Sequence, residues 1–220
     1  MKNVILSFFI CLSFCVSAQK VKVEEEKSNL GGAKNPALSA TIYEASEDDI
    51  NSGWKSVMKS YNGKVSNKDQ GHIADNVVVK ELSNNTCDVY YKVEKVNEKE
   101  HKLVISVNLG GAYMNPGEHP TQTAFFKKLL LDFAVKTSRE AVAEELKDSQ
   151  KALSKLQSTQ RSLEKDQESL KKDIENYKAK IKQAEEDIAK NTTDLGKKKT
   201  EIEAQQKIVD GIQKKKEAIN

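Results

Sequence analysis

Residues 170–188 read LKKDIENYKAKIKQAEEDI, and their apolar side chains recur at alternating steps of four and three residues. The same register runs without a skipped residue from Leu146 to Ile219. An apolar repeat of about 3.5 residues turns one narrow stripe of a helix toward a partner helix, which is typical of a left-handed coiled coil. We therefore predict a coiled-coil stalk over residues 146–220. Its predicted seam residues are Leu153, Leu156, Leu163, Leu170, Ile174, Tyr177, Ile181, Ile188, Leu195, Ile202, Val209 and Ile212.

The seam composition indicates how the helices pair. One seam position of the central heptads holds Ile174, Ile181 and Ile188. The other seam position of the preceding heptads holds Leu156, Leu163 and Leu170. β-Branched residues at the first position with leucine at the second favour a parallel two-stranded coil. In that arrangement the charged residues that face each other beside the seam are opposite in sign: Asp166 and Lys171, Asp173 and Lys178, Lys180 and Glu185, Asp194 and Lys199. We expect a homo-oligomer, in its simplest form a parallel dimer.

The seam weakens toward the C-terminus. Asn191, Lys198 and Gln205 are consecutive polar seam positions, and residues 191–196 contain few good helix formers. One interpretation is a weakened but continuous helix. The other is a turn that folds residues 195–219 back as a hairpin. The register passes through this segment unchanged, which favours the continuous helix.

The N-terminus has the pattern of an export signal. Lys2 precedes a short apolar run from Val4 to Val16, and small residues stand at the positions before a cut after Ala18. The run is shorter than the roughly 20 residues that span a bilayer, and no later segment is apolar enough to do so. A lipid-modified Cys15 is disfavoured because the bulky Phe14 precedes it. We expect residues 1–18 to be removed and the protein to be exported, to the periplasm or outside the cell.

Removal of such a signal would leave Cys87 as the one cysteine of the mature chain, so an intrachain disulfide is excluded there. Its place beside Val89 and Tyr91 favours a buried strand cysteine, because free cysteine is among the most buried residue types. The alternative is an intermolecular disulfide in an oxidising compartment.

Between the signal and the stalk we predict two segments. Residues 19–36 are polar and end in Gly-Gly and Asn-Pro, so we expect a flexible tether. Residues 37–145 predict an α+β head with an antiparallel sheet. A strand over 37–45 precedes a helix that Ser46 caps and Asn62-Gly63 ends, with Trp54 as its core anchor. Four strands follow within residues 64–66, 73–82, 87–96 and 103–109, and the long helix opens at Pro120.

The order strand, helix, four strands, long helix resembles the TBP-like fold and its helix-grip relatives, in which helices cover one face of a single sheet. The helix-grip resemblance implies an apolar ligand between the sheet and the long helix. The whole layout, a small α+β domain before a coiled coil, also resembles uncharacterised exported bacterial proteins, and that resemblance implies no activity. The TBP-like resemblance covers residues 37–146 and rests on element order, with no motif.

The sequence offers little that would carry chemistry. The net charge is only +3, with both signs mixed along the chain, so no face for nucleic acid is predicted. His72, His101 and His119 have no second ligand at a metal-binding spacing, and we expect His101 and His119 to be solvated loop residues. His72 and Asp75 could form a dyad, but no nucleophile accompanies them. We predict no catalytic residue, no metal site and no cofactor.

Three functions remain. The first is a non-enzymatic exported protein whose coiled coil self-associates as a spacer or scaffold, with an unknown partner in the cell envelope. The second is a head domain that encloses an apolar ligand lined by Phe126, Leu130 and Phe133, although ordinary core packing explains the same residues. The third is a holdase chaperone, which lacks an obvious apolar inner surface once the apolar residues of the stalk are used in the seam.

Overall fold

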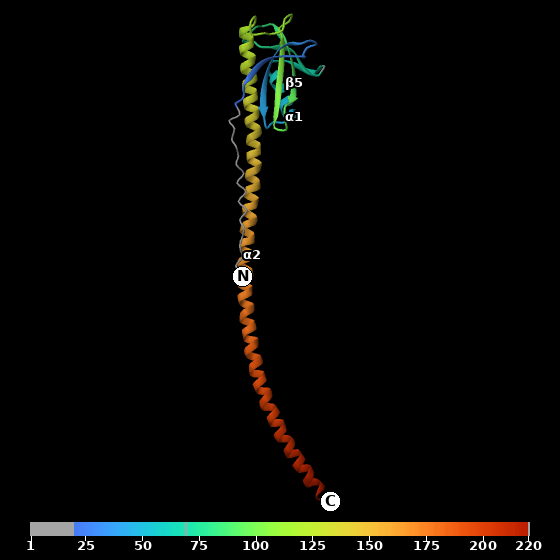
Figure 1. The fold of residues 1–220 in the computed structure, drawn as a ribbon, viewed down its shortest axis with the longest axis vertical. Coiled ribbons are helices and arrows are strands. Elements are labelled where there is room, and N and C mark those ends of the chain that lie inside the picture. The colour runs from blue at the N-terminus through green and yellow to red at the C-terminus, as the bar shows by residue number, and fades with distance from the viewer. Residues whose placement is uncertain (1–19, 69, 220) are drawn as a thin grey trace. The chain divides into compact units, whose positions relative to one another are not determined.

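The computed structural model describes residues 20–68 and 70–219. The predicted export signal over residues 1–18 lies outside them. The chain divides into two compact units, with the boundary after Ser149. The first unit contains the sheet, one complete helix and the beginning of a second helix, and the second unit consists of helix (Figure 1).

One six-stranded antiparallel sheet organises the first unit, with the strand order β1-β2-β6-β5-β4-β3. The strands are β1 (Val23–Ser28), β2 (Asn35–Tyr43), β3 (Lys64–Lys68), β4 (Gly71–Val78), β5 (Thr86–Lys95) and β6 (Glu100–Asn108). The helices are α1 (Glu47–Ser60), between β2 and β3, and α2 (Pro120–Glu217), after β6. The predicted α+β class, an antiparallel sheet followed by a long helix, is confirmed.

Local signals explain the ends of α1. The Ser46 hydroxyl accepts a hydrogen bond of 3.1 Å from the Asp49 amide, which satisfies one of the free N–H groups of the first turn. At the other end Asn62 adopts a left-handed backbone with a φ of 64°. The Gly63 amide then donates to the Met58 carbonyl at 3.0 Å. The helix therefore begins and ends where the sequence predicts.

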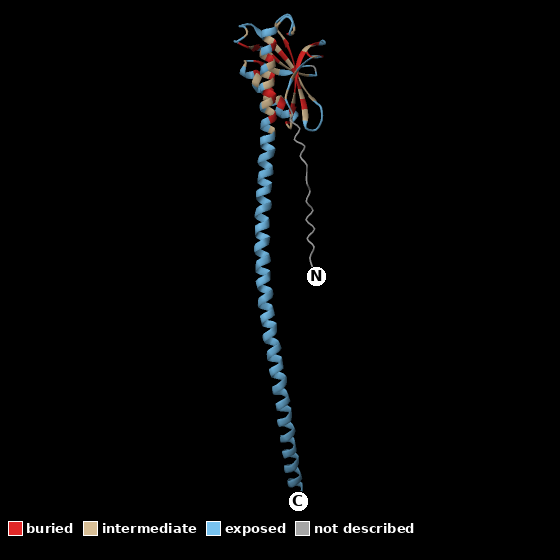
Figure 2. Cartoon of the chain, turned by 60° about the vertical axis from the view of Figure 1, so that its left-hand side comes forward, coloured by how far each residue is buried: buried red, intermediate tan, exposed pale blue. Residues whose placement is uncertain are grey.

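The core lies between one face of the sheet and the two helices. Trp54 is fully buried, and its ring meets Phe133 of α2 edge-on with centroids 5.1 Å apart. Phe126 and Leu130 of α2 are also fully buried in this cluster. In Figure 2 the buried residues of α2 are confined to the turns beside the sheet. The first part of the long helix therefore packs on the sheet.

The structure corrects the predicted tether over residues 19–36. Val23–Ser28 form β1, which pairs antiparallel with β2 along its whole length. Val23 packs against the core, and Glu26 forms an ion pair of 2.5 Å with Lys102 on β6. The segment is polar because an edge strand carries charged side chains that discourage pairing with another chain. The order of the head is therefore strand-strand-helix-four strands-helix, with one strand more than predicted.

His101 is a second correction. It was expected to be a solvated loop residue, yet it lies in β6 and is only 7% exposed. The strand begins at Glu100, three residues before the apolar alternation becomes visible at Leu103 in the sequence. That start places His101 on the same face as Leu103 and Ile105, toward the core.

The described part of the second unit is the continuation of helix α2. α2 continues through residues 191–196 without interruption, so the turn that was considered there is absent and the continuous helix is confirmed. Within residues 20–68 and 70–219, no helix combines the length and the apolar character that crossing a membrane requires.

Candidate interaction surfaces: the stalk seam and the α1–α2 groove

The predicted seam is an uncovered apolar stripe that includes the polar positions Asn191, Lys198 and Gln205. All twelve predicted seam residues lie on α2, and their exposed fractions run from 44% at Val209 to 69% at Leu156. Exposing such a stripe to water costs free energy, and monomeric soluble proteins therefore seldom have large contiguous apolar surfaces. The exposure shows that the apolar spacing belongs to a surface of this chain and is not used to build its own core.

Two further apolar residues adjoin the predicted seam. Val142 is 49% exposed and occupies the seam position four residues before Leu146. Ile208 is also exposed, directly beside Val209. The sequence signal for both was present: Val142 continues the register, and Ile208 widens the stripe next to it.

The charged residues beside the seam have weak contacts within their own helix. Lys178 lies 2.8 Å from Glu175, and Asp194 lies 3.5 Å from Lys197. These pairs are solvent-exposed and are worth only about 0.5 kcal/mol each. They can therefore be exchanged at little cost for contacts with a second helix.

Phe126, Leu130 and Phe133 do not share one environment. Leu130 belongs to the buried core, and Phe126 is fully buried there while also bordering a small hollow of about 130 Å³ near Cys87. Phe133 packs on Trp54 and reaches the floor of an open groove between α1 and α2. The concave surface at Phe133 is thus on the outside of the helix pair, whereas the sequence placed it between sheet and helix.

This α1–α2 groove has a volume of about 670 Å³, within the range of ligand and peptide sites. Its floor consists of small and apolar residues: Ala45, Gly53, Val57, Leu129, Phe133 and Ala141. Gly53 keeps the floor open, because a Cβ atom there would approach the Phe133 ring to 3.1 Å. The absence of this side chain lets α1 lie close to Phe133.

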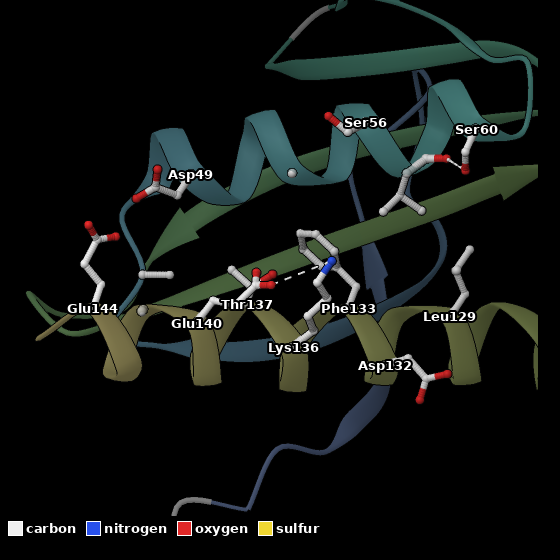
Figure 3. A pocket seen from close by; sticks show the side chains of 14 residues that line it. Asp49, Ser56, Ser60, Leu129, Asp132, Phe133, Lys136, Thr137, Glu140 and Glu144 are labelled. Atoms are coloured by element: carbon white, nitrogen blue, oxygen red, sulfur yellow. Dashed lines mark hydrogen bonds and ion pairs between the residues drawn. The ribbon is translucent and has the colours of Figure 1, made fainter. Parts of the chain in front are cut away.

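Acidic side chains dominate the rim of the groove. Asp49 of α1 and Glu144 of α2 extend toward each other at one end (Figure 3). Glu140 lies one helical turn before Glu144, and its carboxylate is 3.8 Å from the Lys136 amine. Asp132 points away from α1 in Figure 3 and pairs with Lys128 at 2.6 Å. One end of the groove therefore has two acidic side chains and no cation among its lining residues, above an apolar floor.

The histidine dyad considered from the sequence does not form. His72 lies on the face of β4 toward α1, where its ring stacks on Tyr91 with centroids 5.0 Å apart. Asp75 is an odd number of residues away on the same strand and so lies on the opposite face. There it interacts with Asp88 and raises the pKa of that carboxyl group.

Burial perturbs two further titratable groups, Cys87 and Tyr91. Burial in the core raises the pKa of the Cys87 thiol to about 11, with a smaller contribution from Asp88. Desolvation likewise raises the pKa of Tyr91 to about 12. Both groups are therefore held in their neutral forms at pH 7. Among the described residues, no group of three potential metal ligands comes together.

Comparison with protein-family models, with curated proteins and with solved structures finds no match to this chain. The two surfaces above are therefore interpreted from their own geometry.

Proposed function

We propose that this protein is a non-enzymatic, exported structural protein that self-associates through α2 as a parallel coiled-coil homodimer and acts as a spacer or scaffold. The observation that supports this function is the apolar seam, which is exposed on α2 in the single chain. The export signal expected over residues 1–18 supports the location outside the cytoplasm.

The energetics favour a second copy as the occupant of the seam. Burying a leucine or isoleucine side chain fully is worth about 1.5–3 kcal/mol, so pairing contributes roughly 1 kcal/mol for each partly exposed seam residue. Twelve such residues on each helix outweigh an association cost of about 4–15 kcal/mol. A second copy offers the same stripe in the same register over the same length, which an unrelated helix does not.

Charge selects the parallel orientation. In a parallel dimer in register, Asp173 faces Lys178 of the second copy and Lys180 faces Glu185. Each of these pairs joins opposite charges. An antiparallel pair would not place these residues opposite each other, so it would lose the attraction between their opposite charges.

Replacing one seam residue tests the proposal. Ile181→Asp places two carboxylates against each other in the dimer, whereas the matched control Ala179→Asp adds the same side chain on the outer face of the helix. Sedimentation equilibrium of the chain beginning at Gln19 should show a dimer for the parent and the control. The seam variant should raise the dimer dissociation constant by at least about 100-fold.

A parent chain that remains monomeric at high micromolar concentration would contradict the proposal. If that monomer also suppressed the aggregation of unfolded proteins, the seam would be acting as a client-binding surface, and the holdase function would replace the scaffold.

A further inference from the structure

We infer that the α1–α2 groove of the head is a docking site for a basic amphipathic helix of a partner protein. This goes beyond the proposed self-association, because it assigns a recognition surface to the head. The inference rests on the shape of the groove, on its charge and on its separation from the seam.

The walls of the groove suit a helix. α1 and α2 run side by side in opposite directions, so that Asp49 lies across from Glu144 and Ser60 lies near Leu129 (Figure 3). The α2 wall from Leu129 to Glu144 extends for about 22 Å at about 1.5 Å per residue. A helix of about four turns matches this length, and helices commonly bind by laying an apolar face into such a groove.

The floor provides the apolar half of the recognition. Val57, Leu129 and Ala141 are only partly buried, although they are packed against the core cluster. Phe133 supports this floor but is itself buried, because α1 packs closely against its ring at Gly53. Apolar anchors of an incoming helix would cover Val57, Leu129 and Ala141, which the head leaves partly open to water.

The rim provides the charged half. Asp49, Glu140 and Glu144 border the groove, and Lys136 is the cation among its lining residues. Lys136 lies beside Glu140, so the end formed by Asp49 and Glu144 has no lining cation. Two carboxylates that face each other above an apolar floor favour a ligand with positive charges flanking an apolar stripe. Lysine or arginine side chains on an amphipathic helix have this form.

The groove is distinct from the seam. On α2 the lining residues Glu140 and Glu144 fall on one side of the helix, while Val142 and Leu146 begin the exposed seam. Glu144 and Leu146 are two residues apart, so their side chains point about 200° apart around the helix. A bound helix in the groove therefore leaves the seam free, and docking can be measured separately from dimerisation.

Intrinsic fluorescence gives a direct readout. Trp54 is the single tryptophan of the chain, and its ring touches Phe133 on the groove floor. A tryptophan-free synthetic helix of about 16 residues, with lysines flanking a stripe of leucines, should shift the Trp54 emission saturably when titrated into the chain beginning at Gln19. A scrambled peptide of the same composition has no apolar face and should bind at least about tenfold more weakly. Raising the salt concentration should also weaken the binding of the amphipathic peptide, because salt screens its attraction to the acidic rim.

A pair of matched substitutions locates the binding. Glu144→Lys reverses a charge on the rim, whereas Glu145→Lys makes the same change one residue later, outside the groove lining. We expect Glu144→Lys to weaken binding by about fivefold and Glu140→Lys with Glu144→Lys by tenfold or more, with Glu145→Lys close to the parent. Circular dichroism and sedimentation of each variant verify that the head is folded and that the dimer is unchanged.

Three outcomes would overturn the inference. Equal losses for Glu144→Lys and Glu145→Lys would indicate non-specific attraction to an acidic protein. If Ile181→Asp lost peptide binding while the groove variants kept it, the peptide would bind to the seam. A Trp54 shift caused by an uncharged amphiphile but not by the basic helix would make the groove a site for a small apolar ligand.

Discussion

The surroundings of Cys87 determine the reactivity of its thiol. It is buried in the core, and desolvation raises its thiol pKa to about 11. The thiolate is the reactive form, so very little of it exists at pH 7–8. We expect a thiol reagent such as iodoacetamide to modify Cys87 slowly in the native protein and quickly after denaturation, as followed by intact mass. Rapid native labelling, or a dimer that a reductant dissociates, would instead support the intermolecular disulfide.

Asp88 gives a prediction with a defined pH dependence. Its carboxyl pKa is raised above 3.8, first by desolvation and further by the adjacent Asp75, although the Asn76 amide donates to it and opposes the shift. A raised carboxyl pKa means that folding favours the protonated form, so its contribution to stability is present below pH 3.8 and is lost as the pH rises through the folded pKa.

Asp88→Asn keeps the acceptor oxygen for Asn76 and removes the charge. The variant should therefore be more stable than the parent at pH 7, with a difference that shrinks below about pH 4. Urea unfolding of the head, followed by Trp54 fluorescence at both pH values, measures this. A variant that is less stable at pH 7 would show that the Asn76 hydrogen bond to a charged oxygen outweighs the desolvation of that charge.

At the scale of elements, the α1 terminus offers a test of close packing. Gly63 follows the left-handed Asn62, and a Cβ atom on it would lie 2.9 Å from both the Met58 carbonyl oxygen and a methyl group of Val77. Gly63→Ala should lower the free energy of unfolding by about 1–3 kcal/mol, because backbone and core must move. The control Gly117→Ala should change little, since its Cβ would approach an atom of Asn115 no closer than 3.5 Å. Equal thermal stability of the two variants would contradict this packing.

The elements differ in how well the sequence predicts them, and the reason is physical. α1 and the seam depend on residues close together in one helix, such as Ser46 at a cap or Ile174 and Ile181 in one register, so periodicity and capping reveal them. β1 was missed because its stability comes from pairing with β2 and from the Glu26–Lys102 ion pair, to which its own charged sequence gives no clue. The α1–α2 groove was missed for the same reason, because Asp49 and Glu144 meet only after folding.

At the scale of the molecule, the two units should respond differently to concentration. The head buries its own core around Trp54, so its unfolding should be independent of protein concentration. A dimeric stalk is stabilised by mass action, so its unfolding temperature should rise with concentration. Thermal melts between about 1 and 100 µM should separate a concentration-dependent loss of far-ultraviolet helix signal from a constant loss of Trp54 fluorescence. In Ile181→Asp the helix signal should fall at a lower temperature while the Trp54 transition stays in place. If the helix transition of the parent were the same at every concentration, α2 would be stable as a single helix, and its apolar stripe would be free to bind a different partner.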